Sequence, residues 1–318
     1  MPAAATACAA GRARTAFRPL TATPRQSRSC RRVILMRPAA SADAVAVAPA
    51  ACSPELVALA HRLADTAAAV TSRYFRTPVA VDVKQDTSPV TIADREAELA
   101  MREVLRQQCP DHGIFGEEQG YLAGSGGSEY LWVIDPIDGT KSFITGKPLF
   151  GTLIALLHRG EPVLGIIDQP ILKERWVGIT GQQSTFNGAP ISTRSCVAVG
   201  DAYLYATTPH MFEGEGEAAF NRVRDAVRIP MYGCDCYAYG LLAAGYCDLV
   251  VEADLKPYDY MALVPVIQGA GGTITDWRGQ PLRWQAGTEG DVSACSGEVL
   301  AAGDARSHQQ ALQLLAWK

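Results

Sequence analysis

The segment 132–143 constrains the fold and the chemistry of this 318-residue chain more than any other stretch. It reads Trp-Val-Ile-Asp-Pro-Ile-Asp-Gly-Thr-Lys-Ser-Phe and places two carboxylates, Asp135 and Asp138, after an apolar run. Because Pro136 lacks a backbone N–H and fixes its own φ, we expect the chain to leave the strand at that residue. The turn can swing the carbonyl oxygen of Ile137 to the side of the carboxylates, and three such oxygens suit a hard cation such as Mg²⁺.

The next two residues predict an anion site beside these acids. Gly139 and Thr140 lie at an expected helix start, where free backbone N–H groups can hold a phosphate. The alternative is a plain Asx turn that leads into a helix N-cap, which is a common use of an Asp-Pro-x-Asp-Gly sequence.

Acids at two distant positions favour the metal interpretation. Gly116-Glu117-Glu118 follows an apolar pair and is expected to end a short strand, although adjacent glutamates are usually a solvated surface. Asp259 lies two residues after Pro257, which fits a first helical turn, so its carboxylate is expected near a helix N-terminus. A carboxylate that only balances the helix dipole is the alternative for Asp259.

These segments resemble the inositol monophosphatase superfamily of Mg²⁺-dependent phosphomonoesterases, over residues 54–316. Gly-Glu-Glu, then Asp-Pro-Ile-Asp-Gly-Thr, then Glu252 with an aspartate seven residues later match it in type, order and spacing. The resemblance implies two or three Mg²⁺ ions per subunit, a homodimer and inhibition by Li⁺. It implies that the metal ligands are Glu117, Asp135, the Ile137 carbonyl, Asp138 and Asp259.

The resemblance also implies catalytic roles. The segment Thr91–Asp94 matches the family segment whose aspartate partners the motif threonine, so Asp94 and Thr140 would orient and deprotonate the attacking water, with no covalent intermediate. Glu117 would act through waters at a third ion. Lys84 lies where the family has a mobile loop over the metals.

Within the superfamily, the chain is most similar to the plant and bacterial histidinol-phosphate phosphatases, through segments 140–152, 174–178, 232–240 and 251–263. This implies hydrolysis of L-histidinol phosphate in histidine biosynthesis. Because that substrate carries an ammonium and an imidazole, carboxylates and aromatic faces would suit it. We expect the phosphate on Gly139 and Thr140 near Asp259, and the cationic end on Asp235 and Glu252 with Tyr237 nearby.

Alternatives remain for substrate and class. Asp235 is interpreted equally well as a plain helix N-cap, and Glu252 would also suit the hydroxyls of an inositol or sugar phosphate. A non-catalytic metal-binding regulatory protein is the alternative from a different class.

Residues 1–42 contain eight Arg, no Lys and no acid, which is typical of an organelle transit peptide. A basic nucleic-acid-binding arm is the alternative. We expect residues 43–53 to be a linker, and the plastid rather than the mitochondrion to be the destination, because the resembled enzymes of plants and algae work there. Removing eight Arg from a net charge of −4 leaves about −12, which disfavours nucleic acid as a partner. No apolar run is long enough to span a membrane.

The order of elements predicts two halves. Helical periodicity over 54–74 and 91–107 followed by a run of strands predicts an α+β half. Alternating strands and helices after residue 200, including a helix over 257–268, predict an α/β half. Together with these two halves, the family resemblance implies a layered α/β/α/β sandwich. Its N-terminal domain, 54–195, would carry most metal ligands, and its C-terminal domain, 196–318, would supply Asp259 and the specificity residues.

Overall fold

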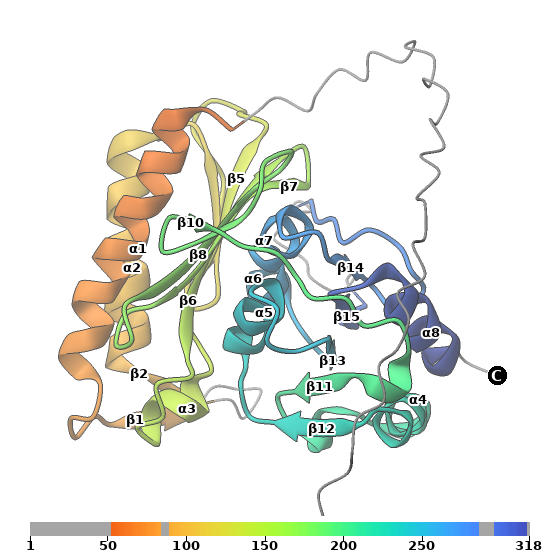
Figure 1. Ribbon diagram of the computed structural model, residues 1–318. Helices are drawn as coiled ribbons and strands as arrows, with labels where there is room; N and C mark the ends of the chain where they lie inside the picture. The colour runs from red at the N-terminus through yellow and green to blue at the C-terminus, as the bar shows by residue number, and fades with distance from the viewer. Residues whose placement is uncertain (1–51, 84–88, 286–295, 317–318) are drawn as a thin grey trace, which may run out of the picture. The chain divides into compact units, whose positions relative to one another are not determined.

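Two helices cover one face of the larger sheet (Figure 1). α1 (Pro54–Tyr74) begins after Ser53, whose hydroxyl accepts a hydrogen bond from a first-turn N–H, and a proline takes the first helical position. α2 (Ile92–Gln108) begins after Thr91, which forms a capping box with Asp94. The first predicted helix is confirmed at both ends, and the second is shifted by one residue.

This structure, a computed structural model, describes residues 52–83, 89–285 and 296–316. The expected transit peptide and Lys84 lie outside the described residues. The described residues form a single compact unit. Among the described residues, no helix has both the length and the apolar composition needed to cross a membrane.

The larger sheet has eight strands in the order β10-β9-β8-β7-β6-β5-β3-β4. All neighbours are antiparallel except β3 and β5, which are parallel. Its strands are β3 (Gly113–Gly116), β4 (Gly120–Leu122), β5 (Tyr130–Asp138), β6 (Gly151–His158), β7 (Glu161–Gln169), β8 (Glu174–Ile179), β9 (Thr185–Phe186) and β10 (Ala189–Pro190). A separate hairpin precedes α2 and is formed by β1 (Val81–Val83) and β2 (Pro89–Thr91).

β5 does not end at Pro136, as the sequence predicted, but continues to Asp138. The pairing with β6 runs from Asp135 opposite Leu153 to Asp138 opposite Gly151, so β5 holds one extra residue there. This β-bulge explains the difference, because a bulged residue needs no ladder hydrogen bond and a proline is tolerated in it.

The smaller sheet has five strands in the order β12-β11-β13-β15-β14 and is mixed. The pairs β11–β12 and β11–β13 are parallel, and the other two pairs are antiparallel. Its strands are β11 (Tyr203–Ala206), β12 (Ile229–Tyr232), β13 (Leu249–Glu252), β14 (Thr273–Thr275) and β15 (Val299–Ala302).

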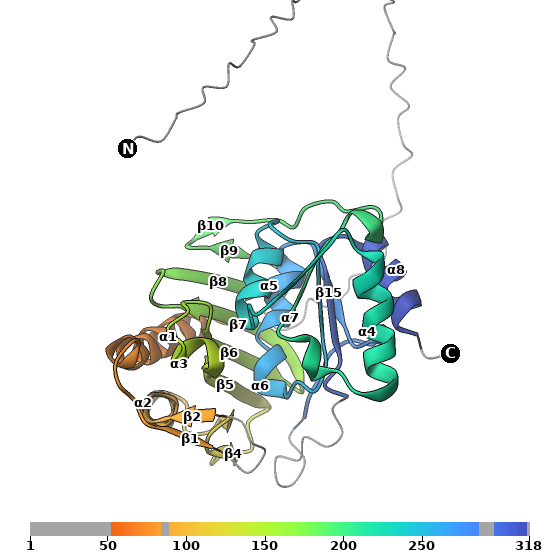
Figure 2. The same cartoon turned by 90° about the horizontal axis from the view of Figure 1, so that it is seen from below.

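Helices separate the two sheets (Figure 2). α5 (Cys236–Ala243) and α7 (Leu263–Gly269) contribute to an apolar core shared with both sheets, while α4 (Gly214–Ala226) and α8 (Ala305–Leu315) pack on the far face of the smaller sheet. This confirms the layered α/β arrangement, and α4 and α8 add an outer layer to the four expected. The division at residues 195 and 196 stays a prediction, since α5 and α7 contact both sheets.

The helix predicted over 257–268 is two helices, α6 (Pro257–Tyr260) and α7. Pro265 explains the break, because it has no N–H to donate to the carbonyl of Met261 four residues earlier. The prediction missed this proline as a helix breaker. The break leaves α6 as a separate short helix at the end of β5.

Two glycines let α7 lie directly against the larger sheet. Gly165 on β7 and Gly178 on β8 are cross-strand partners. A Cβ at Gly165 would come within 1.9 Å of the Ala262 carbonyl oxygen, and one at Gly178 within 2.3 Å of the Pro265 carbonyl carbon. The backbone of the α6–α7 segment therefore occupies the space that side chains would fill, and this contact fixes α6 over the sheet.

We expect Gly178→Ala to lower the melting temperature. The added methyl would overpack the α7 contact at a cost of about 1–3 kcal/mol, which corresponds to a drop of roughly 3–10 °C in a domain of this size. Thermal unfolding by circular dichroism measures the effect. Gly200→Ala is the matched control, because its Cβ would lie 3.7 Å from the nearest heavy atom, an ordinary contact. Equal melting temperatures for the two variants would contradict the packing argument.

Candidate active site

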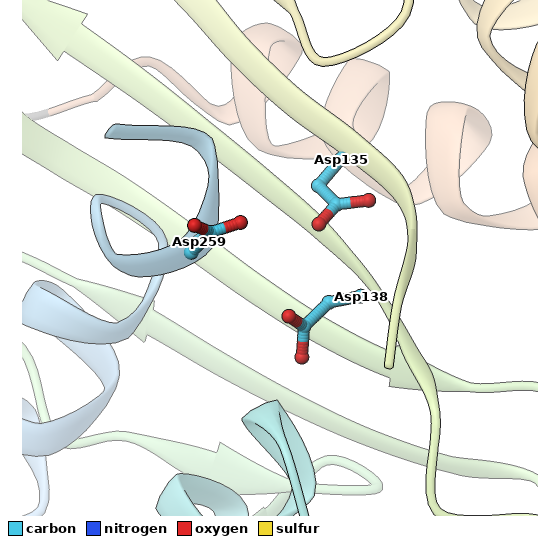
Figure 3. Close-up of side chains that lie close together, drawn as sticks. All are labelled: Asp135, Asp138 and Asp259. Carbon is cyan, nitrogen blue, oxygen red and sulfur yellow. The ribbon is translucent and has the colours of Figure 1, made fainter. Parts of the chain in front are cut away.

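Three carboxylates converge beside the end of β5 (Figure 3). Asp135 and Asp138 belong to β5, and Asp259 belongs to α6. One oxygen from each side chain lies within 4.8 Å of the others. Carboxylate oxygens at this separation can hold a hard divalent cation between them.

The β-bulge explains why Asp135 and Asp138 point the same way. Residues three apart on a regular strand face opposite sides of the sheet, and one extra residue restores the same side. The bulge is fixed by two hydrogen bonds, one from the Ile137 N–H to Asp135 Oδ1 at 2.9 Å and one from Thr152 Oγ1 to the Pro136 carbonyl at 2.8 Å. The first of these is an Asx turn, so the alternative interpretation of this segment describes part of the same geometry.

Asp259 is held by its own helix end. Its Oδ2 accepts a hydrogen bond from the Lys256 N–H at 2.7 Å, immediately before α6. This hydrogen bond holds the carboxylate next to the two carboxylates of β5. The sequence placed Asp259 near a helix N-terminus, and the structure confirms that position.

Glu117 reaches the same place from another strand. It follows β3, and its N–H donates to the Ile134 carbonyl on the parallel strand β5 at 3.3 Å. Glu117 lines one cavity with Asp138 and Asp259, although it is not one of the three acids within 4.8 Å of each other. The four acids expected to act together are therefore neighbours, with Glu117 at the edge of the group.

The acids raise each other's pKa. Burial, followed by the charge of Glu117, raises the pKa of Asp259 to about 8. Burial and the charges of Glu117 and Asp138 hold the pKa of Asp135 well above its usual range. The pKa of Asp138 is raised in the same way, by burial and by the charges of Asp235 and Asp259. A bound cation would offset this repulsion, so the donor set fits a divalent metal.

A hydroxyl and a buried acid lie next to the group. Thr140 Oγ1 donates to the Ile137 carbonyl at 3.2 Å and lies 3.5 Å from Asp94 Oδ1. The other Asp94 oxygen accepts from the Thr91 N–H and hydroxyl, at 2.9 and 2.6 Å. The capping box of α2 thus leaves only Asp94 Oδ1 directed at Thr140. α3 (Thr140–Ile144) starts at this threonine, after Gly139 with φ 87°, as the sequence predicted.

Two more acids line the cavity from the second half of the chain. Glu252, at the end of β13, accepts hydrogen bonds from the Thr207 N–H at 2.8 Å and from the Tyr239 hydroxyl at 2.9 Å. Burial raises the pKa of Glu252 to about 7. Asp235 accepts from the hydroxyls of Ser142, at 3.0 Å, and Thr207, at 3.3 Å.

Asp235 is not an ordinary N-cap. It does occupy the position before α5, but its side chain makes no capping hydrogen bond and its φ is 46°, which is unusual for a residue other than glycine. The N–H of Cys236 donates instead to Asp138 Oδ2 at 2.6 Å. The start of α5 is therefore joined to β5 through one of the three clustered carboxylates.

The aromatic residue at the cavity is Tyr239 rather than Tyr237. The Tyr237 hydroxyl donates to Glu174 at 2.6 Å, whereas Tyr239 lines the cavity beside Glu252. Residues two apart on a helix face different directions, and Tyr239 lies four residues after Asp235, the residue that precedes α5. That spacing is the sequence signal that could have identified it.

One cavity of about 250 Å³ is lined by the acids Glu117, Asp138, Asp235, Glu252 and Asp259 and by Thr140. Its apolar lining includes Met211 and Leu255. The cavity is large enough for a small molecule, and Asp235 and Glu252 line it together with two acids of the candidate cation site.

Known proteins of one family resemble this chain over most of its length. The model of the inositol monophosphatase family matches residues 54–313. The bifunctional phosphatase IMPL2, chloroplastic, of Arabidopsis thaliana is 57% identical over 82% of this chain and 75% of the relative. A histidinol-phosphatase of Chlorobaculum parvum is 36% identical over 70% of this chain and 86% of its own length.

Among solved structures, an inositol monophosphatase from Zymomonas mobilis is 50% identical, with a TM-score of 0.72 over 82% of this chain and 97% of that one. The family model spans nearly the whole described part of the chain, and both acidic strand ends described above lie within it. The chain therefore belongs to the inositol monophosphatase family.

Proposed function

We propose that this phosphatase of the inositol monophosphatase family hydrolyses L-histidinol phosphate to L-histidinol and phosphate, with Mg²⁺ as its cofactor. The observation that carries the proposal is the convergence of Asp135, Asp138 and Asp259 within 4.8 Å, next to a second pair of acids in the same cavity. The first group suits the metal, and the second suits a substrate that carries positive charge.

The proposed metal ligands are those expected from the sequence: Glu117, Asp135, the Ile137 carbonyl, Asp138 and Asp259. When bound, two or three Mg²⁺ ions would offset the negative charge of the phosphate ester and make water a better nucleophile. Three of these acids, Glu117, Asp138 and Asp259, line the cavity together with Gly139 and Thr140, whose N–H groups would hold the phosphate oxygens.

Thr140 and Asp94 have the geometry of a proton relay. Thr140 Oγ1 would accept a proton from the attacking water and pass its own to Asp94 Oδ1. Burial raises the pKa of Asp94, with Glu117 a smaller cause, so the carboxylate is a better base than an exposed aspartate. The hydrogen bonds from Thr91 keep the carboxylate oriented towards Thr140.

Asp235 and Glu252 support the choice of a cationic substrate. Thr207 bonds both, through its hydroxyl to Asp235 and its N–H to Glu252, and so holds the two acids on one side of the cavity. Two carboxylates beyond the metal group would attract an ammonium or imidazolium group. Histidinol-phosphatases of Mycobacterium tuberculosis and Streptomyces coelicolor, 34% and 35% identical, also favour this substrate.

An inositol phosphate is the second candidate. It is favoured by the similarity to the inositol monophosphatase from Zymomonas mobilis and by Glu252, which could accept hydrogen bonds from substrate hydroxyls. A metal-binding regulatory role is the third, and a substrate panel with Mg²⁺ that released no phosphate would favour it. A plastid location is supported by the Arabidopsis relative, which is named chloroplastic. We also propose a homodimer, as the resemblance implied.

We expect Asp135→Asn to reduce phosphate release by at least about 10³-fold, because the variant loses one carboxylate charge shared between metal ions. The fold should persist, since the substitution removes a buried charge that its neighbours repel. Phosphate release at saturating Mg²⁺ and thermal unfolding measure the two effects. Near-normal turnover in the folded variant would refute the proposed role of Asp135.

We expect Glu252→Gln to raise KM for L-histidinol phosphate by about 10-fold or more, because the variant would lose one hydrogen bond between charged groups. The KM for 4-nitrophenyl phosphate, which has no cation, should change little. Steady-state kinetics with both substrates measure the difference. The same KM increase for both would leave the cationic-substrate proposal without support.

Without metal, we expect the protein to lose stability as pH rises from about 4 to about 8. A carboxylate whose pKa is higher in the folded protein binds more protons when folded, so raising the pH through this range favours unfolding. Asp259, with its pKa raised to about 8, sets the upper end of the range. Melting temperatures at several pH values, in EDTA and in Mg²⁺, measure this dependence.

Mg²⁺ should remove most of this pH dependence, and Asp259→Asn should reduce it in EDTA. A metal-free protein that became more stable between pH 5 and pH 8 would contradict the arrangement of charges proposed for the site.

A further inference from the structure

We propose that Glu98 is a positioning residue that fixes the turn carrying Glu117. The inference rests on the proposed function, in which Glu117 is a metal ligand. Glu98 lies on α2, one helical turn after Asp94, and its side chain is fully buried, with 0% exposed. A buried carboxylate needs several donors to offset the loss of water, and its donors show what it holds in place.

The Glu98 carboxylate bonds the backbone directly after Glu117. Its Oε2 accepts from the Glu118 N–H at 2.7 Å, and its Oε1 accepts from the Gln119 N–H at 2.9 Å. Two successive N–H groups of the β3–β4 turn therefore point at one carboxylate. A shift of this turn would break both hydrogen bonds and leave a buried charge short of donors.

Arg102 holds the other end of the same turn. Its Nε donates to Glu98 Oε1 at 2.7 Å, and its Nη2 donates to the Gly120 carbonyl at 2.5 Å. Gly120 pairs with Gly116 across the start of the β3–β4 hairpin. Glu98 thus accepts hydrogen bonds from N–H groups inside the turn, and Arg102 donates one to a carbonyl group at its end. Together they fix the turn on both sides of Glu118.

Gly116 shows how closely Glu98 approaches. A Cβ at Gly116 would lie 2.4 Å from Glu98 Oε1 and 2.5 Å from the carboxyl carbon. Only a glycine before Glu117 leaves the carboxylate enough room. The carboxylate therefore touches the strand end before Glu117 as well as the turn after it.

α2 is the element common to Glu117 and the proton relay. Asp94 and Glu98 are four residues apart, on one helix face. Asp94 lies beside Thr140, and Glu98 binds the Glu117 turn. One helix thereby fixes the separation between the relay and the turn that carries a proposed metal ligand.

Stability alone does not explain this ion pair, because a buried pair commonly adds no more stability than apolar side chains of the same volume. A residue that orients a metal ligand has a different effect, since its loss typically weakens metal affinity about 10- to 100-fold. Metal affinity is therefore the property that tests the role of Glu98.

The test is Mg²⁺ binding by isothermal titration calorimetry on the full chain, with Glu98→Gln. The amide keeps the side-chain volume but removes the charge and places an NH₂ group against one backbone N–H. We expect the Kd for Mg²⁺ to rise about 10-fold or more. When the Mg²⁺ concentration is varied, kcat at saturation should fall by a smaller factor than kcat/KM.

Asp248→Asn is the matched control. Asp248 is also buried, accepts from Arg194 Nε at 2.6 Å and from the Tyr203 N–H at 2.8 Å, and lies next to the smaller sheet. The Asp248→Asn variant should have a lower melting temperature and an unchanged Kd for Mg²⁺. A Kd for Glu98→Gln equal to that of the wild type would overturn the inference, as would an equal change in both variants.

A second variant serves if Glu98→Gln does not fold. Gly116→Ala keeps the charge and pushes the carboxylate away from the turn. It should therefore also weaken Mg²⁺ binding, and an unchanged Kd would overturn the inference.

Asp135→Asn separates the inference from the proposed function. If it loses Mg²⁺ while Glu98→Gln and Gly116→Ala bind normally, only the inference fails. If the wild type binds no Mg²⁺, both fail.

Discussion

The extra residue in β5 places Asp135 and Asp138 on one side of the strand, and the rest of the site is arranged around that pair. Asp259 reaches the pair because α6 ends early and α7 lies against two paired glycines of the larger sheet. Glu117 reaches it because β3 runs parallel to β5. If β5 were regular at Pro136, one of its two carboxylates would point to the opposite face of the sheet. Only the other carboxylate would then face the remaining acids of the site.

The acids at this site reduce the stability of the metal-free fold. Each is buried near others of like charge, which is why the pKa values of Asp135, Asp138 and Asp259 are raised. Local hydrogen bonds offset part of this cost, such as the Cys236 N–H to Asp138 and the Lys256 N–H to Asp259. They are made by backbone groups, which hold the carboxylates in place without neutralising them. The net charge that remains is what a divalent cation requires.

The sequence predicted the elements whose signals are local. The Ser-Pro start and the apolar periodicity of α1 lie within one segment, as do the acids on both sides of Pro136. Signals that depend on packing were missed: the short strands β2, β4, β9 and β10, the effect of Pro265 on the predicted 257–268 helix, and Tyr239 in place of Tyr237. The role of Glu98 could not be found from sequence, because the N–H groups that it binds after Glu117 lie 20 and 21 residues away and become its neighbours only in the folded chain.

In the proposed function, the metal ligands and the acids that bind the cationic substrate come from segments next to different sheets. Asp135 and Asp138 come from the larger sheet, whereas Asp235 and Glu252 come from segments next to the smaller one. The two groups are not independent, because the N–H of Cys236, next to Asp235, bonds Asp138 on β5. Because Thr207 bonds both Asp235 and Glu252, a change at either acid would disturb the other, and the proposed substrate preference should depend on the pair as a unit.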